Sequence, residues 1–156
     1  MSHNLDMVAQ VVRRLGDLRE EVVFLGGAVT ALLITDPGAP EIRPTDDVDV
    51  VAEVISHAAY GKLSERLRKL QFKEDVEEGA PACRWVIDGI KVDVMPTSAK
   101  VLGFSNRWYG PAIEHAQRVE SGWPDHPGGQ RALLPRHQAR SLRRPRRGGL
   151  PRQPRP

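Results

Sequence analysis

The segment Thr-Asp-Asp-Val-Asp-Val-Val at residues 45–51 carries the pattern that decides the fold. Acidic and apolar residues alternate along it, which is the period-two pattern of a β-strand with two different faces. Asp47 and Asp49 therefore project from one face of the predicted strand, while Val48 and Val50 enter a core on the other face. The segment predicts a half-buried strand with a paired acidic face.

A β-hairpin is predicted further along the chain by the dipeptide Asp88-Gly89, which suits a type I′ turn. Segments rich in apolar residues, 83–87 and 90–94, flank this turn. The valines of the second segment share one face, which leaves Asp93 on the other face. If this strand and the strand at 45–51 bury their valines in a common core, Asp93 joins the two earlier carboxylates on a polar face.

Three converging carboxylates predict a site for a hard divalent cation such as Mg²⁺, which prefers oxygen ligands. Asp47, Asp49 and Asp93 would hold one or two such ions. A two-ion site activates a nucleophile and stabilises the leaving oxygens of a phosphoryl or nucleotidyl transfer. The alternative is that the acidic pair is only the solvated face of a half-buried sheet.

Gly26 and Gly27 follow a short apolar run at residues 22–25 that is predicted to be a buried strand. A tight turn from a strand into a helix exposes backbone N–H groups that can bind phosphate oxygens. The pair is therefore a candidate for holding a triphosphate, although many such pairs are plain turns.

The remaining periodicity predicts helices at residues 5–18, 28–35, 57–70 and 106–118. Together with the strands they give the order α-β-α-β-α-β-β-α. We therefore expect an α/β (α+β) fold, in which helices flank a small mixed β-sheet.

Charge divides the chain into two parts, a domain at residues 1–121 and a tail at 122–156. The tail contains 9 Arg and 1 Asp, whereas the domain contains 14 basic and 19 acidic residues. The tail is also rich in proline and glycine, so it is predicted to be disordered. One hypothesis is that the tail is translated out of frame from GC-rich codons, and the competing hypothesis is that it binds nucleic acid through phosphate contacts.

Composition excludes several classes of protein. The 156 residues allow one domain, and the single cysteine, Cys83, excludes an intramolecular disulfide and a cysteine-rich zinc site. No apolar run is long enough to span a bilayer, and the N-terminus lacks the pattern of a signal peptide. The expectation is a cytoplasmic protein with no membrane partner.

Three segments together resemble the nucleotidyltransferase superfamily pattern of a Gly pair, an acidic pair on a strand and a later third carboxylate. A fourth segment is similar to the AbiEii-type toxins of bacterial toxin–antitoxin systems, and the resemblance covers roughly residues 8–120. The superfamily pattern is carried by Phe24-Leu25-Gly26-Gly27, Arg43-x-Thr45-x-Asp47-Val48-Asp49-Val50 and Lys91-Val92-Asp93-Val94, and the toxin-like segment is Leu102-Gly103-Phe104-Ser105-Asn106-Arg107-Trp108-Tyr109.

The resemblance implies a Mg²⁺-dependent enzyme that transfers a nucleoside monophosphate from an NTP to an acceptor hydroxyl, with tRNA or another RNA as a candidate acceptor and a cognate antitoxin as a candidate partner. Gly26 and Gly27 would hold the triphosphate. Asp93 would complete the metal site or act as a base. Arg43 would steady phosphate charge, or it would form a surface salt bridge. Thr45 would support the loop before the strand.

Family members continue past this length into a second half with a lysine thought to contact the nucleotide, whereas this chain has no lysine after Lys100. The resemblance therefore implies a chain that is C-terminally truncated or frameshifted. The alternatives to an active enzyme are a catalytically incomplete remnant and an RNA-binding module with a basic tail.

Overall fold

The computed structural model describes residues 3–33, 44–121 and 130–135, and its side chains are described for residues 3–29 and 44–118. Five strands form the main sheet, in the order β1-β2-β5-β4-β3, and two more form a separate hairpin. The strands are β1 Val22–Leu25, β2 Asp47–Ala52, β3 Lys73–Glu74, β4 Arg84–Ile87, β5 Ile90–Pro96, β6 Ala116–Ser121 and β7 Gln130–Pro135; the helices are α1 His3–Leu15, η1 Gly16–Glu20, α2 Gly26–Leu33, α3 His57–Lys69, α4 Ala99–Leu102 and α5 Tyr109–Glu114.

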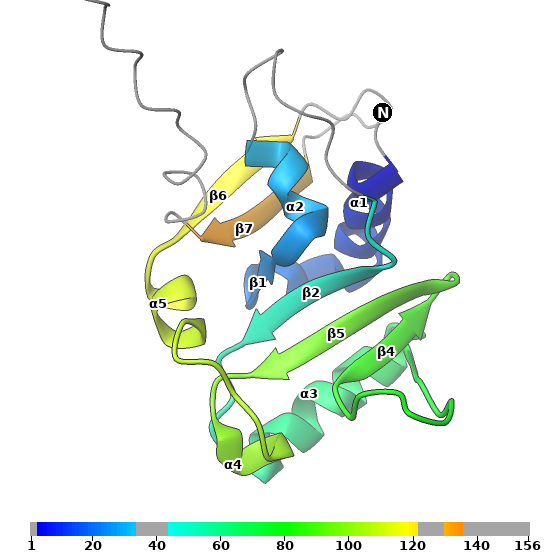
Figure 1. The fold of residues 1–156 in the computed structure, drawn as a ribbon, viewed down its shortest axis with the longest axis vertical. Helices are drawn as coiled ribbons and strands as arrows, with labels where there is room; N and C mark the ends of the chain where they lie inside the picture. The colour runs from blue at the N-terminus through cyan, green and yellow to red at the C-terminus, as the bar shows by residue number, and fades with distance from the viewer. Residues whose placement is uncertain (1–2, 34–43, 122–129, 136–156) are drawn as a thin grey trace, which may run out of the picture.

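The sheet is mixed, as the sequence predicted. β2 and β5 run parallel, and all other neighbours are antiparallel. The parallel pair is possible because the chain crosses over through α3 before it returns as the β4–β5 hairpin. Figure 1 shows this pair at the centre of the sheet, with α3 lying across its far side.

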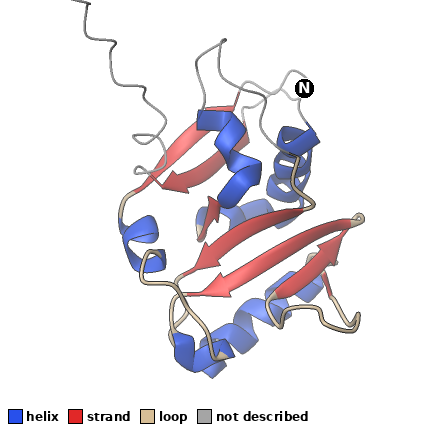
Figure 2. Ribbon diagram, in the orientation of Figure 1, coloured by secondary structure: helices blue, strands red, loops and turns tan. Residues whose placement is uncertain are grey.

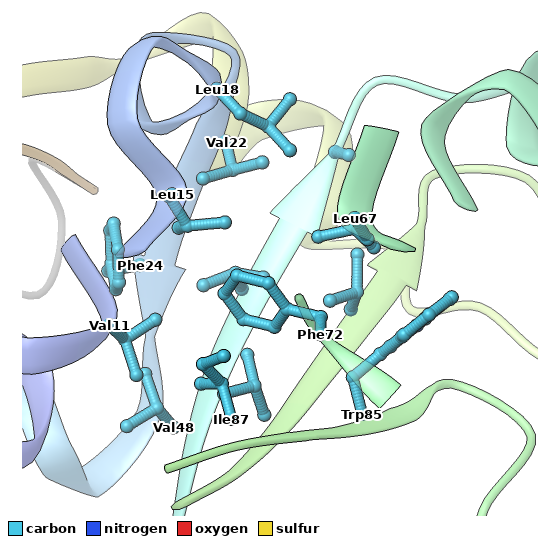
Figure 3. Close-up of a cluster of buried hydrophobic side chains, with 14 of the residues drawn as sticks. Val11, Leu15, Leu18, Val22, Phe24, Val48, Leu67, Phe72, Trp85 and Ile87 are labelled. Carbon is cyan, nitrogen blue, oxygen red and sulfur yellow. The ribbon is translucent and has the colours of Figure 1, made fainter. Parts of the chain in front are cut away.

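The core lies on the face of the sheet that α1 and α3 cover (Figure 2). Val48, Val50 and Val92 are fully buried there, which confirms the alternation predicted for β2 and β5. The labelled side chains in Figure 3 show how α1, β1, α3 and the β4 strand contribute to one cluster. That cluster includes Val11, Leu15, Leu18, Val22, Phe24, Val48, Leu67, Phe72, Trp85 and Ile87.

The predicted hairpin is confirmed in its turn and in its register. Asp88 and Gly89 have φ angles of 50° and 79°, the positive values that a type I′ turn requires. Arg14 of α1 ties this turn to the first helix, with Nε and Nη2 each 2.6 Å from an oxygen of Asp88. The turn therefore sets which residues of β4 and β5 face each other.

The helix predicted over residues 106–118 is wrong in its extent. The structure has the short helix α5, and β6 begins at Ala116 and pairs with β7. Pairing between distant segments overrides the local helical pattern, because a strand's stability depends on its neighbours more than on its own residues.

β7 lies within residues 122–156, the segment that composition predicts to be disordered. Residues 130–135 of that segment form this strand, which contacts β1 and α1 as well as β6. Residues 122–129 and 136–156 lie outside the described part of the chain. Within the described ranges, none of the helices is both long and apolar enough to cross a bilayer.

Candidate active site

Three carboxylates lie on the face of the sheet opposite the core, as the sequence predicted. Asp49 of β2 pairs directly with Asp93 of the parallel strand β5, and Asp47 lies two residues before Asp49. Asp93 is buried, and the other two are partly buried. The register of two neighbouring strands therefore brings the carboxylates together (Figure 1, β2 and β5).

Arg84 of β4 holds two of these carboxylates. Its Nε lies 2.7 Å from Asp93 Oδ1, and its Nη2 lies 2.8 Å from Asp93 Oδ2 and 3.0 Å from Asp47 Oδ2. Only 18% of the Arg84 side chain is exposed. The hydrogen bond to Asp93 raises the pKa of Arg84, so this guanidinium keeps its charge.

Arg84 is not among the site residues predicted from the sequence, although the hairpin turn indicates its position. A two-residue turn at Asp88-Gly89 fixes the register of the hairpin, which places Arg84 opposite Asp93. Residues that face each other across an antiparallel pair share one side of the sheet. Counting outward from the turn would therefore have placed Arg84 on the carboxylate face.

The surroundings of Asp49 disfavour its ionised form. Burial, together with the negative charges of Asp47 and Asp93, raises its pKa from 3.8 to about 6, while Arg84 acts in the opposite direction. Loss of water and nearby like charge both disfavour the ionised form of a carboxyl group. Asp49 would therefore gain from an additional cation at this face.

Gly26 begins α2 directly against Asp49. Its φ is 74°, and a Cβ atom at this position would collide with Asp49 Oδ2. Both observations require glycine, one through backbone conformation and one through space. Gly27 is less constrained, since a Cβ there would meet Thr45 only at 3.9 Å. The Gly pair thus lies beside the carboxylates, at the N-terminus of an eight-residue helix.

A small hydrogen-bond network fixes the start of β2. The Thr45 hydroxyl donates to Asp47 Oδ1 at 2.9 Å, and the Thr45 backbone N–H donates to Asn4 Oδ1 at 3.1 Å. Asn4 is buried in α1. These bonds give Thr45 the supporting role that the sequence indicated, and they add Asn4, which the sequence reading did not find.

Aromatic residues lie at one side of the carboxylate face. The Tyr109 hydroxyl lies 2.7 Å from Met95 Sδ on β5, and burial together with the charges of Asp49 and Asp93 raises the Tyr109 pKa. The neighbouring Trp108 is 55% exposed, and the Arg107 guanidinium lies 4.8 Å from the centre of its ring. The toxin-like segment noted in the sequence is therefore close to the site.

Three more residues from the segments that resemble the superfamily pattern are Arg43, Asp46 and Lys91. Arg43 is outside the described residues. Asp46 is exposed and lies just before the first residue of β2. Lys91 is on the carboxylate face by register, but its ammonium lies 3.9 Å from the exposed carboxylate of Glu77.

The donor set fits Mg²⁺ in its chemistry, because three carboxylates on adjacent strands offer only hard oxygen ligands. As they stand, however, no three Asp, Glu, His or Cys side chains in the described part of the chain are gathered closely enough to hold one metal ion. Arg84 supplies the positive charge that Asp47 and Asp93 share.

No protein-family model matches the chain, and a search of curated proteins finds no match. Among solved structures, the crystal structure of an antigenic nucleotidyltransferase-like protein from Paracoccidioides brasiliensis matches with a TM-score of 0.52 and 20% sequence identity. The chain has a nucleotidyltransferase-like fold. The match covers 85% of this chain and 60% of the other, so the chain spans less than two thirds of its structural neighbour.

Together with the strand order, this likeness confirms the expected mixed sheet flanked by helices. At 20% identity it is the fold that is shared. The AbiEii-type subtype stays a prediction.

Proposed function

We propose that the protein is a Mg²⁺-dependent nucleotidyltransferase that transfers a nucleoside monophosphate from an NTP to an acceptor hydroxyl. The observation that carries this proposal is the juxtaposition of Asp47, Asp49 and Asp93 with the Gly26 N-terminus of α2, in a nucleotidyltransferase-like fold. Carboxylates beside a helix N-terminus offer separate sites for a cation and for phosphate oxygens.

In the proposed reaction, the acceptor oxygen forms a bond to the α-phosphorus, the α–β phosphoanhydride bond breaks, and pyrophosphate leaves. Mg²⁺ held by Asp47, Asp49 and Asp93 would neutralise phosphate charge and activate the nucleophile, as one or two ions. Gly26 and Gly27 would bind the triphosphate through backbone N–H groups. Asp93 is the candidate base for the hydroxyl proton, a role that requires its release from Arg84.

An RNA acceptor, such as tRNA, is the finer part of the proposal. Support comes from the exposed Trp108 with Arg107 stacked on its ring, next to Tyr109 at the edge of the site. Aromatic rings and arginine planes are the surfaces on which unpaired bases stack. The resemblance of this segment to AbiEii-type toxins adds the proposal that the enzyme is the toxin of a toxin–antitoxin system with a cognate antitoxin.

The test is nucleotide incorporation with labelled NTPs, Mg²⁺ and tRNA. Asp47→Asn and Asp49→Asn should each lower the rate by about 100-fold or more, since each removes several kcal/mol of stabilisation from a metal-assisted transition state. Asp46→Asn is the matched control, because it removes the same charge from an exposed neighbouring position. Equal rates in all four proteins would refute the proposed site.

A folded wild-type chain without incorporation activity would support the catalytically incomplete remnant instead. The toxin role has its own readout, bacterial growth during expression of the chain. Growth arrest by the wild type and by Asp46→Asn, but not by Asp49→Asn, is the expected result. Arrest by all three would separate toxicity from the carboxylate site.

A further inference from the structure

Arg84 occupies the carboxylate cluster as a built-in cation. It bridges two strands, because it donates to Asp93 on β5 and to Asp47 on β2. Its two hydrogen bonds to Asp93 take one oxygen each, at 2.7 and 2.8 Å. A guanidinium that matches a carboxylate in this bidentate way is the strongest arrangement that an arginine offers.

The same contacts engage every oxygen of the two carboxylates. Both oxygens of Asp93 and Oδ2 of Asp47 accept from Arg84, and Oδ1 of Asp47 accepts from Thr45. Mg²⁺ requires ligand oxygens at about 2.0–2.1 Å in octahedral geometry. A guanidinium hydrogen-bonded to the same oxygens therefore competes with the ion for their lone pairs and repels its charge.

The balance of charge points the same way. The cluster contains three carboxylates, and Arg84 donates hydrogen bonds to two of them, Asp47 and Asp93. The site thus attracts a divalent cation, while the ligands that the cation needs are engaged. Binding of an ion is therefore coupled to release of the Arg84 hydrogen bonds.

We propose that Arg84 is an internal competitor for the divalent cation, so that it must release Asp47 or Asp93 before these carboxylates bind metal. This inference rests on the metal site in the proposed function, and it adds that Arg84 raises the metal concentration needed to fill that site. Arg84 preserves the carboxylates in a paired state without metal, and it sets the metal concentration at which the site fills. Arg84 acts here as a positioning residue.

The test is binding of Mn²⁺ to the full chain without nucleotide, with free Mn²⁺ measured by electron paramagnetic resonance. Arg84→Gln should bind Mn²⁺ at least about fivefold more tightly than the wild type, the lower end of typical coupling between two sites. Arg66→Gln is the matched control, because Arg66 makes a similar fork with Glu21 on the surface, at 2.7 Å for each bond. It removes the same charge and should leave Mn²⁺ affinity unchanged.

Arg84→Lys keeps the charge without the fork and should bind Mn²⁺ with intermediate affinity. It also serves where Arg84→Gln fails to fold, which thermal unfolding followed by circular dichroism would reveal. A second readout is the Arg84 Nε–H resonance in the wild type, which should shift on addition of Mg²⁺, while that of Arg66 should not.

The outcomes separate this inference from the proposed function. If the wild type binds Mn²⁺, and Arg84→Gln and Arg84→Lys bind it with the same or lower affinity, the competitor role is overturned and the metal site stands. Equal tightening in Arg84→Gln and Arg66→Gln would reduce the effect to net charge and would also overturn it. Failure of every variant to bind Mn²⁺ would overturn both the competitor role and the metal site.

Discussion

At the scale of single residues, the contact between Gly26 and Asp49 links backbone conformation to the chemistry of the site. Gly26 allows α2 to begin with a positive φ, and its lack of a side chain leaves room for the Asp49 carboxylate. Burial at this position is also part of what raises the Asp49 pKa. The contact between Gly26 and Asp49 therefore links the geometry of this face to the protonation of the Asp49 carboxyl group.

Replacing Gly26 with alanine should destabilise the fold. A left-handed conformation costs an L-residue about 1–2 kcal/mol, and the collision with Asp49 adds to this cost. The free energy of unfolding in urea measures the effect. Gly61→Ala is the matched control, because nothing lies within 4 Å of its added methyl group in α3. It should stabilise the protein by about 0.5–1 kcal/mol, and a similar loss in both variants would contradict the argument.

The raised pKa of Asp49 predicts a pH-dependent stability. Between pH 3.8 and about 6, the folded state holds a proton on Asp49 that the unfolded state has lost. The contribution of Asp49 to stability is therefore fully present below this window and is lost as pH rises through it. Urea midpoints from pH 4 to 7 should fall less steeply in Asp49→Asn than in the wild type. Asp46→Asn, at an exposed position, should keep the wild-type slope, and a change there instead would contradict the assignment.

Much of the site could be predicted from the sequence, and the part that was missed has a physical explanation. The alternation in residues 45–51 and the valines around Asp93 sufficed to place three carboxylates on one face, since strand geometry is local. Arg84 and Asn4 depend on which segment lies opposite, a tertiary property. Of these two, only Arg84 could have been predicted, because the register set by the Asp88-Gly89 turn places it opposite Asp93.

At the scale of elements, the β4–β5 hairpin determines which charge meets Asp93. Its two-residue turn pairs Ile87 with Ile90 and, three steps further out, Arg84 with Asp93. A slip of one residue would turn Arg84 toward the core and leave Asp93 without this partner. The turn is therefore as important to the site as the residues that line it.

Gly89→Ala should weaken this hairpin. Gly89 has a φ of 79°, at which a side chain is strained by about 1–2 kcal/mol even though open space surrounds it. The expected result is a lower urea midpoint together with a shift in the Arg84 Nε–H resonance. Gly79→Ala is the control, because Gly79 has a similar φ of 82° and open space around it but lies outside this turn, and it should leave the Arg84 resonance unchanged. A full-strength Arg84 signal in Gly89→Ala at the wild-type position would show that the register does not depend on this turn.

The region after α4 shows where prediction by element failed. Residues 106–118 have apolar spacing that suits a helix, yet only Tyr109–Glu114 are helical and Ala116–Ser121 are a strand. The partner strand, Gln130–Pro135, belongs to a segment whose composition predicted disorder. Neither half of this pair carries a strong strand signal alone, so the pairing could not be read from local pattern.

At the scale of the whole molecule, the sheet separates stability from chemistry by its two faces. One face carries the valines that α1 and α3 bury, and the other carries the carboxylates, Arg84 and the N-terminus of α2. The basic character of the chain comes from a third part, because eight of the nine arginines after residue 121 follow Pro135. Net charge therefore describes neither face of the sheet.

Two truncations should separate the role of β7 from that of the basic segment. Removal of residues 122–156 deletes β7, which pairs with β6 and contacts β1, so the thermal midpoint should fall clearly. Removal of residues 136–156 leaves every described element in place and should change the midpoint much less. The shorter truncation also removes eight arginines, so binding to unrelated RNAs should weaken and depend less on salt. Unchanged RNA binding in the 1–135 chain would exclude the basic segment as an RNA-binding module and would leave the Arg107–Trp108 stack as the surface to examine.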